Sequence, residues 1–362
     1  MGLYLKENIR SILNDMVNLS QRSLINSPDN PWQYILIDYN KDIVFTGGGD
    51  NIFLSAITET EGEGNYFKAV VDLKRFFEAI KFMGKDTEIN LEDSQVVLKK
   101  GQKIVRLQIS NDLISPYLPV MPREMFKKEG DERIYFTAKE LEILKKFVME
   151  DILRPALCRI SALNRNGSVY FAATDSFKLC ELQTNKCNIN KSYLLRPIIP
   201  FSIDEDIYIH TIRGFTIFSS FDRVIYQLNI QEMFPDYYKI INSLEGSLIT
   251  VNVKDLLFSL RSFVAFDSRP GSLVDISIKD NKMKLISSNI NSKHSDRVFD
   301  TISVKNNDME INMCMQTQYF ADIIDGYSKS EGAKDEVNLY FNNKVGIYIK
   351  EKDKVFVALG RN

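Results

Sequence analysis

The chain has few of the residues from which most catalytic and metal sites are built. Only two histidines occur, His210 and His294, and they are far apart in the sequence. The four cysteines include no CxxC pair, which argues against a zinc ribbon and a disulfide framework, so we expect reduced, mostly buried thiols. No GxSxG or HExxH pattern is present. We therefore expect no metal, no cofactor and no catalytic centre.

Strong net charge and long apolar runs are also missing. A formal net charge of −2 does not favour a protein that grasps nucleic acid through bulk charge. No window of about 20 residues lacks charged side chains, and the N-terminus has no basic stretch before a long apolar run. These absences predict a cytoplasmic protein without a signal peptide or membrane span.

An internal repeat is the main positive signal. Three segments alternate apolar and polar residues through three short runs separated by tight turns: Glu88–Ile109, Asp206–Ile230 and Glu336–Leu359. This pattern is typical of half-buried antiparallel strands, so each copy is predicted to be a small meander. The copies start roughly 120 to 130 residues apart, which is the signature of repeated units. The chain of 362 residues is long enough for three such domains.

Each predicted unit has the order helix, strands, helix, strands. Apolar residues at helical spacing predict the first helix of each unit. The three helices are expected over Leu5–Leu19, after a cap at Thr137, and over Val253–Phe266. Second helices are expected at Asp72–Met83 and Gln316–Tyr327, whereas Pro197 and Pro200 should make the one near Leu194–Ser202 short or broken. The Gly47–Gly49 run is expected to form a hairpin turn. The predicted fold class is α+β, with three repeated domains at 1–132, 133–246 and 247–362.

Two short stretches are more specific than the rest. They are Ala173–Leu179, which reads ATDSFKL, and Phe234–Ile240, which reads FPDYYKI. Together with the triplication they resemble the bacterial DNA polymerase III beta subunit, the beta sliding clamp, whose stretches read ATDGHRL and FPDYRRV. Ser176 and Phe177 stand where that family has Gly and His, Lys239 stands where Arg is usual, and the chain ends in ALGRN. The departures fit a divergent bacterial lineage or a bacteriophage.

The resemblance implies a non-enzymatic DNA sliding clamp, a processivity factor. Two chains would close head to tail into a homodimeric ring of six domains, with inner helices, outer antiparallel sheets and double-stranded DNA through the hole. Such a ring holds DNA by topology, independently of base sequence, so the small net charge is no obstacle. The implied partners are a DNA polymerase, a clamp loader and other proteins that carry clamp-binding motifs.

The resemblance also implies a partner-peptide pocket, because in the family both stretches receive such peptides. An apolar recess with polar neighbours would hold a Leu or Phe anchor of the peptide. Lys178 and Lys239 would lie on its rim, and the last residues of the chain would complete it. The predicted pocket residues are Leu157, Thr174, Ser176, Phe177, Lys178, Leu179, Pro235, Lys239, Ile240, Ala358, Leu359, Gly360 and Arg361.

Two further surfaces follow from the expected ring. The DNA-facing residues would be basic side chains on or near the inner helices: Arg22, Lys74, Arg75, Lys139, Lys145, Lys146, Arg154, Arg196 and Lys254. The dimer interface would join sheet edges of two chains, because an exposed edge needs a cover. Its apolar part would comprise Val105, Leu107, Phe263 and Val264.

Two other functions remain open on the sequence. A three-module interaction scaffold would show the same repeats but would not encircle DNA. A nuclease that uses scattered carboxylates would show magnesium-dependent activity, and nothing in the sequence favours it.

Overall fold

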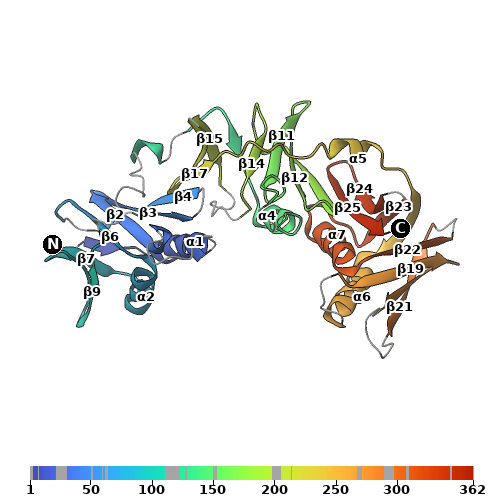
Figure 1. Cartoon of the computed structure of the whole chain (residues 1–362), viewed down its shortest axis with the longest axis horizontal. Helices are drawn as coiled ribbons and strands as arrows, with labels where there is room; N and C mark the ends of the chain where they lie inside the picture. Colours follow the sequence, from blue (N-terminus) through green and yellow to red (C-terminus); the bar gives the residue numbers. More distant parts are fainter. Residues whose placement is uncertain are drawn as a thin grey trace. The chain divides into compact units, whose positions relative to one another are not determined.

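The protein forms two compact units, described here from a computed structural model. The first comprises Met1–Tyr135 with Ile198–Asn229, and the second Phe136–Pro197 with Ile230–Asn362. Figure 1 colours the elements of both units along the chain. The structure describes residues 3–6, 8–21, 31–49, 52–58, 60–61, 64–110, 123–126, 129–149, 153–197, 205–212, 214–266, 271–288, 297–306, 310–342 and 345–361.

The first unit contains two antiparallel sheets. The five-stranded sheet has the order β5 (Thr60–Glu61), β1 (Leu3–Leu5), β7 (Thr87–Glu92), β8 (Gln95–Lys100) and β9 (Lys103–Gln108). The eight-stranded sheet has the order β10 (Arg133–Ile134), β15 (Ile207–Ile212), β16 (Phe215–Ser219), β17 (Arg223–Leu228), β4 (Ile52–Thr58), β3 (Asp42–Gly49), β2 (Tyr34–Asn40) and β6 (Phe67–Asp72). A short 3-10 turn precedes β2 at Pro31–Gln33, and another lies at Arg123–Met125.

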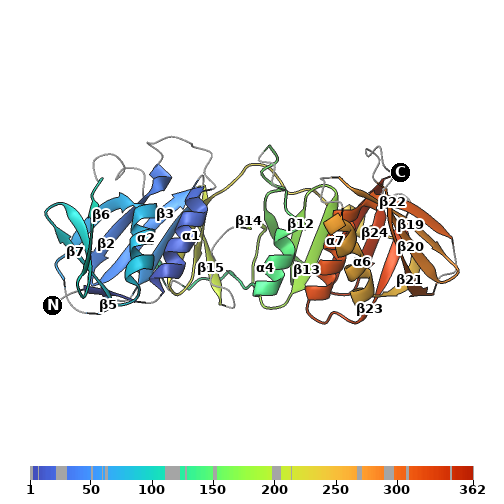
Figure 2. The same cartoon turned by 90° about the horizontal axis from the view of Figure 1, so that it is seen from below.

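Helices α1 (Ile9–Gln21) and α2 (Leu73–Met83) lie side by side against this unit's strands, as Figure 2 shows. The apolar face of α2 is buried, and the Asp72 carboxylate caps the helix by accepting a hydrogen bond from the Arg75 amide at 2.7 Å. Because both helices bury only one stripe, their other faces remain free to carry polar side chains.

The second unit is built on one twelve-stranded antiparallel network. Its order is β14 (Tyr193–Leu195), β11 (Ile160–Arg165), β12 (Ser168–Thr174), β13 (Lys178–Thr184), β25 (Lys354–Arg361), β22 (Ile311–Gln316), β19 (Leu273–Lys279), β20 (Lys282–Ser288), β21 (Arg297–Lys305), β18 (Ser247–Asn252), β23 (Glu336–Asn342) and β24 (Gly346–Lys350). β24 also pairs with β25. β25 therefore joins the strands of the second repeat to those of the third.

Four helices belong to this unit: α4 (Ala138–Lys145), α5 (Tyr238–Asn242), α6 (Val253–Phe266) and α7 (Thr317–Lys329). α4, α7 and α6 stand in a row across the strands in Figure 2. α4 begins at a capping box, in which Thr137 and Glu140 satisfy each other's backbone amides. The short α5 follows the FPD turn and was not expected from the sequence.

Most expected elements are confirmed. The three meanders are β7–β8–β9, β15–β16–β17 and β23–β24–β25, and α2, α4, α6 and α7 occupy the expected segments. The first helix was expected from Leu5, but Leu5 ends β1 and α1 begins at Ile9. The second helix of the second repeat was expected near Leu194–Ser202, but β14 occupies its start. From residue 198 to Ser202 the expected helix lies outside the described residues.

The prediction of a hairpin turn at Gly47–Gly49 is wrong. All three glycines belong to β3 and pair with β4, Gly47 with Leu54 and Gly49 with Ile52. A Cβ atom on Gly49 would lie 2.5 Å from the Leu19 carbonyl oxygen of α1. The glycines therefore allow the helix backbone to approach the strand closely.

The predicted division into domains at 1–132, 133–246 and 247–362 remains a prediction. β17 of the second repeat pairs with β4 of the first, and β13 of the second pairs with β25 of the third. Strand pairing therefore divides the second repeat between the two compact units.

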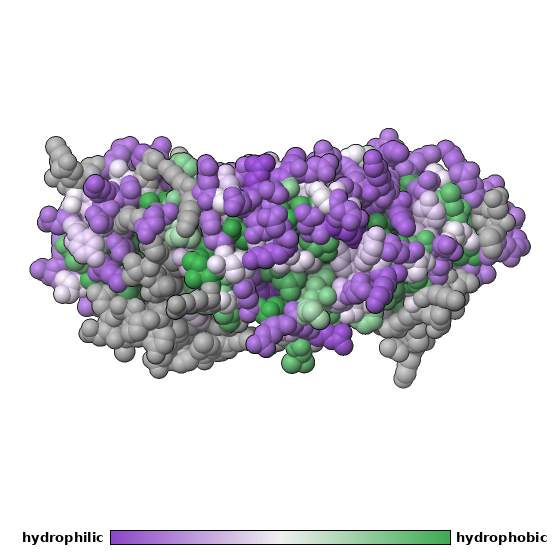
Figure 3. All heavy atoms as spheres, turned by 90° about the horizontal axis from the view of Figure 1, so that it is seen from above, coloured by the Kyte–Doolittle hydropathy of each residue, from purple (hydrophilic) through white to green (hydrophobic). Residues whose placement is uncertain are grey.

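The surface drawn in Figure 3 is mostly hydrophilic, with apolar side chains in small groups. No helix in the described part of the chain is long and apolar enough to cross a membrane. Within the same residues, no three His, Cys, Asp or Glu side chains cluster as metal ligands.

Candidate functional site

The structure brings the two specific stretches and the end of the chain together. β13 pairs with β25, which places Lys178 opposite Ala358 and Leu179 opposite Val357. The Leu359 amide also donates a hydrogen bond of 2.8 Å to the Phe177 carbonyl oxygen. Residues about 180 positions apart in the sequence thus lie side by side in the second unit.

A buried apolar cluster underlies this region. It comprises Ala172, Leu179, Tyr237, Ile241, Leu244, Tyr348, Val355 and Val357, with Phe234 and Leu359 packed against it. The predicted residues Leu157, Thr174 and Ala358 are buried too. Pro235 is exposed, and Ile240 points its side chain to solvent while the next residue, Ile241, enters the cluster.

A tight turn from Thr174 to Lys178 presents the site's polar groups. The Asp175 carboxylate accepts hydrogen bonds from the amides of Phe177 and Lys178, at 2.9 and 2.8 Å. The Thr174 hydroxyl donates to the Lys178 carbonyl oxygen at 2.7 Å. Ser176 has a φ of 80°, a conformation that favours glycine, which is the residue of the beta-clamp pattern at this position.

Phe177 forms the most exposed aromatic surface of the site. Its ring is 51% exposed and stacks on Tyr319 of α7, with centroids 5.8 Å apart and an interplanar angle of 14°. Tyr319 was missed by the sequence reasoning. The only signal available was its helical position near the start of α7, which does not reveal its approach to β13.

Lys178 lies inside the protein rather than on the rim. Its side chain is 9% exposed and pairs with Asp322 of α7, and Gln318 donates a hydrogen bond to the same carboxylate at 2.8 Å. Lys239 does lie on the surface, where it pairs with Asp236 at 3.1 Å. Only one of the two expected rim lysines is therefore available to a ligand.

Buried polar contacts hold α5 against the strands. The Tyr237 hydroxyl donates a 2.8 Å hydrogen bond to Glu181, which also pairs with Arg165 at 3.0 and 3.1 Å. Burial and the nearby Glu181 carboxylate raise the pKa of Tyr237, so the phenol stays protonated and remains a donor. The Arg165 guanidinium lies between the rings of Tyr170 and Tyr238, 3.8 and 4.1 Å from their centroids.

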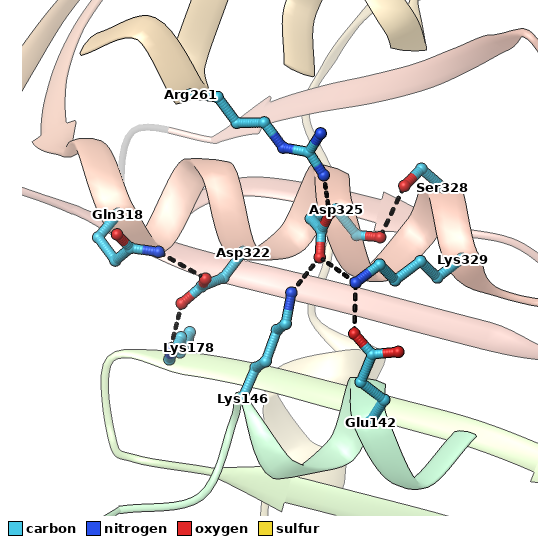
Figure 4. Close-up of polar contacts among 9 residues, drawn as sticks. All are labelled: Glu142, Lys146, Lys178, Arg261, Gln318, Asp322, Asp325, Ser328 and Lys329. Carbon is cyan, nitrogen blue, oxygen red and sulfur yellow. Dashed lines mark hydrogen bonds and ion pairs between the residues drawn. The ribbon is translucent and has the colours of Figure 1, made fainter. Parts of the chain in front are cut away.

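A cluster of ion pairs behind the site joins three helices, as Figure 4 shows. Asp325 of α7 pairs with Lys146 at the end of α4, with Arg261 of α6 at 2.6 Å and with Lys329 at 3.3 Å. Burial alone would raise the pKa of Asp325, but hydrogen bonds from Lys146 and Arg261 outweigh burial and lower it. Lys329 also pairs with Glu142 of α4 at 2.5 Å.

The last described residues form part of the network rather than a tail. Gly360 pairs with Met315 and Arg361 with Cys314, both on β22. A Cβ atom on Gly346, whose φ is 127°, would lie 2.2 Å from the Ala358 carbonyl oxygen, so this close approach requires glycine.

The predicted DNA-facing residues occupy several elements. Exposed side chains are carried by α2 (Lys74, Arg75), α4 (Lys139, Lys145), the loop before β11 (Arg154) and α6 (Lys254). Lys254 pairs with Asp335 at 3.0 Å, and Arg154 lies 3.5 Å from the Ser176 hydroxyl. Lys146 is half-buried in the ion cluster, Arg196 is half-buried after β14, and Arg22 lies outside the described residues.

The predicted interface residues differ in accessibility. β9 has β8 as its one neighbour among the described strands, and Val105 on it is half-buried whereas Leu107 is buried. On α6, Val264 is half-buried but Phe263 is 1% exposed, because it packs into the core of its own unit. The large side chains that α6 exposes are Phe258 and Phe266, which the sequence reasoning missed.

Comparison with known proteins found matches among solved structures. No family model matches the chain, and no curated protein matches it by sequence. The DNA polymerase III subunit beta from Pseudomonas aeruginosa superimposes with a TM-score of 0.80 at 12% identity, covering 100% of this chain and 99% of that one.

Two further solved structures agree. The DNA polymerase sliding clamp from Bacillus subtilis has a TM-score of 0.78 at 18% identity, over 99% of this chain and 98% of that one. The Helicobacter pylori beta clamp bound to a DNA ligase peptide has a TM-score of 0.79 at 12% identity, over 100% and 99%. The resemblance drawn from the sequence is thus confirmed for the fold: the chain has the α+β fold of the bacterial beta sliding clamps along its full length.

Proposed function

We propose that this protein is a DNA sliding clamp, a non-catalytic processivity factor that encircles duplex DNA and tethers a polymerase to it. The observation that carries the proposal is the full-length fold match, at a TM-score of 0.80 over 100% of the chain, to a DNA polymerase III beta subunit. The match covers all three repeats. It therefore supports a function that needs every repeat rather than a shared single module.

The site of the second unit is proposed to bind short peptides of partner proteins, among them a polymerase and a clamp loader. A clamp of the same fold has been solved with a DNA ligase peptide, which supports this type of partner. In this chain the buried cluster under Leu179 and Leu359 offers an apolar base. Exposed Phe177, Pro235 and Ile240 would supply contact area for an apolar anchor.

Ring closure is proposed to pair β9 of one copy with β21 of a second copy. In the described part of the chain, β9 pairs only with β8. β21 pairs along its length with β20 but meets β18 only at Val304 and Lys305. Two half-paired edges in one chain allow a closed head-to-tail dimer, which would cover both edges.

The decisive experiment combines solution mass with retention on DNA. Light scattering is expected to give a dimer of the 41.7 kDa chain. The protein, loaded onto nicked circular DNA, should stay bound at high salt and be lost when the circle is linearised, because only topology survives salt screening.

The same experiment tests the alternative of an interaction scaffold. A monomer whose DNA retention is the same on circular and linear molecules would contradict the clamp proposal. The peptide-binding site would then be tested as a scaffold site on its own.

A further inference from the structure

Arg159 is a buried arginine that has no counter-ion among the residues that the structure describes. It directly precedes β11 and is 3% exposed. Its Nη1 atom has no hydrogen-bond partner, and no carboxylate in the described part of the chain pairs with the guanidinium. Arginine is almost never fully buried unless it is paired, because an isolated charge loses its hydration without compensation. The Arg159 guanidinium therefore has no compensating anion among the described residues.

A second arginine lies directly across the strand pair. In the β11–β14 ladder Ile160 pairs with Leu195, so one step further the register sets Arg159 opposite Arg196. Like charges in this arrangement repel each other. Burial, and then the charge of Arg196, lower the pKa of Arg159 to about 9, whereas Cys158 acts in the opposite direction. Both the burial and the repulsion would be relieved by one bound anion.

We propose that Arg159 and Arg196 form a binding site for a phosphate group. Two guanidinium groups supply two positive charges, and each can donate paired hydrogen bonds to phosphate oxygens, which matches a dianionic tetrahedral group better than a single carboxylate. β14 ends the network of described strands, and Cys158 and Arg196 beside the buried guanidinium are half-exposed. A phosphate can thus approach from the edge of the sheet.

The phosphate site needs no partner copy and no peptide, so it can be tested separately from the proposed clamp function, and Arg196 is also one of the predicted DNA-facing residues. The phosphate group can come from solution or from a nucleic-acid backbone. Both sources present the same oxygens to the arginines, so the first experiment tests the chemistry and the second tests the source.

The first experiment measures thermal unfolding of the full chain in sodium phosphate and in sodium chloride of equal ionic strength. Phosphate at about ten times its Kd should raise the Tm of the wild-type protein by roughly 2 °C. Arg159→Met should lose this rise. Lys352→Met, which removes one exposed positive charge from the same unit, should keep it.

Two results would overturn the proposal: no phosphate-dependent rise in the wild-type protein, or an equal rise in Arg159→Met. If Arg159→Met does not fold, Arg196→Met provides the second test, because this half-exposed side chain can be removed from the surface. Its phosphate response should fall, and a full wild-type response would contradict the site.

The second experiment measures binding of a fluorescein-labelled short duplex at low salt. If the phosphate belongs to DNA, Arg159→Met should weaken duplex binding several-fold and inorganic phosphate should compete with the duplex. If the site takes free phosphate, duplex binding should equal that of the wild-type protein while the Tm response is still lost. If Lys352→Met also loses both the phosphate-dependent rise in Tm and the duplex binding, the result would contradict a specific site at Arg159.

Discussion

Phe177 is one of the residues at which this chain departs from the beta-clamp pattern in the proposed peptide site. Histidine, the family's residue here, can donate a hydrogen bond, whereas phenylalanine cannot. In this chain the ring stacks on Tyr319 and leaves half of its surface to solvent. We expect the site to favour partner peptides that place an apolar or aromatic side chain on this pair.

Replacing Phe177 by Ala should weaken peptide binding with little effect on folding. Loss of an aromatic contact at the edge of a binding site costs about 1–2 kcal/mol, or roughly 5- to 30-fold in Kd. The measurement is calorimetric titration with a synthetic peptide that carries a Leu–Phe anchor.

Phe258→Ala is the matched control, because it removes an even more exposed phenylalanine, 75% against 51% for Phe177, from α6 of the same unit. It should bind the peptide as the wild-type protein does. Equal affinity of Phe177→Ala and the wild-type protein would show that the peptide does not contact this ring.

At the scale of elements, α7 carries the ion pairs that join it to other parts of the second unit. It carries Asp325, which joins it to α4 and α6, and Asp322, which holds Lys178 of β13. The helix therefore links the proposed peptide site to the row of helices. Buried ion pairs of this kind contribute little when complete but cost several kcal/mol when one partner is lost.

Asp325→Asn should lower the free energy of unfolding by about 1–3 kcal/mol at neutral pH, because three cations lose their shared carboxylate and two of them are half-buried. Since the folded-state pKa of Asp325 is lowered, its contribution is complete above the unfolded-state pKa of about 4. It is lost as the pH falls toward the lower folded-state value.

Urea unfolding at pH 7 and pH 3 checks this expectation. The difference between wild-type protein and Asp325→Asn should be larger at pH 7 than at pH 3. Asp335→Asn, which removes an exposed partner of Lys254, should change stability by less than about 1 kcal/mol at either pH. A difference for Asp325→Asn that does not depend on pH would contradict the role of its charge.

At the scale of the whole molecule, assembly depends on the sheet edge at β9. Val105 lies on this strand opposite Leu98 of β8 and is half-buried in the single chain. If β9 meets a second copy, Val105→Glu places a charge in an apolar interface and should convert the dimer into monomer.

Light scattering over a range of concentrations measures this change, and the thermal unfolding curve verifies that the variant folds. Gln102→Glu, in the exposed turn between β8 and β9, adds the same charge outside the proposed contact and should remain dimeric. A folded Val105→Glu that stays dimeric would move the interface away from β9.

Much of the fold could be predicted because local patterns express it directly. Alternation marked the three meanders, helical spacing marked α1, α2, α6 and α7, and Thr137 marked the start of α4. The prediction of a hairpin turn at Gly47–Gly49 failed because the sequence does not reveal that Leu19 of α1 packs onto that strand.

The sequence alone therefore determined the repeat, the element order and the two stretches that bear the resemblance. Tertiary structure decided which of two nearby residues on the same element or turn faces the solvent. These are Ile240 rather than Ile241, Phe258 rather than Phe263, and Phe177 rather than Lys178. The physical reason is that exposure depends on what packs against an element from elsewhere in the chain. Arg159 is the clearest case, because only the pairing of β11 with β14 sets it opposite Arg196.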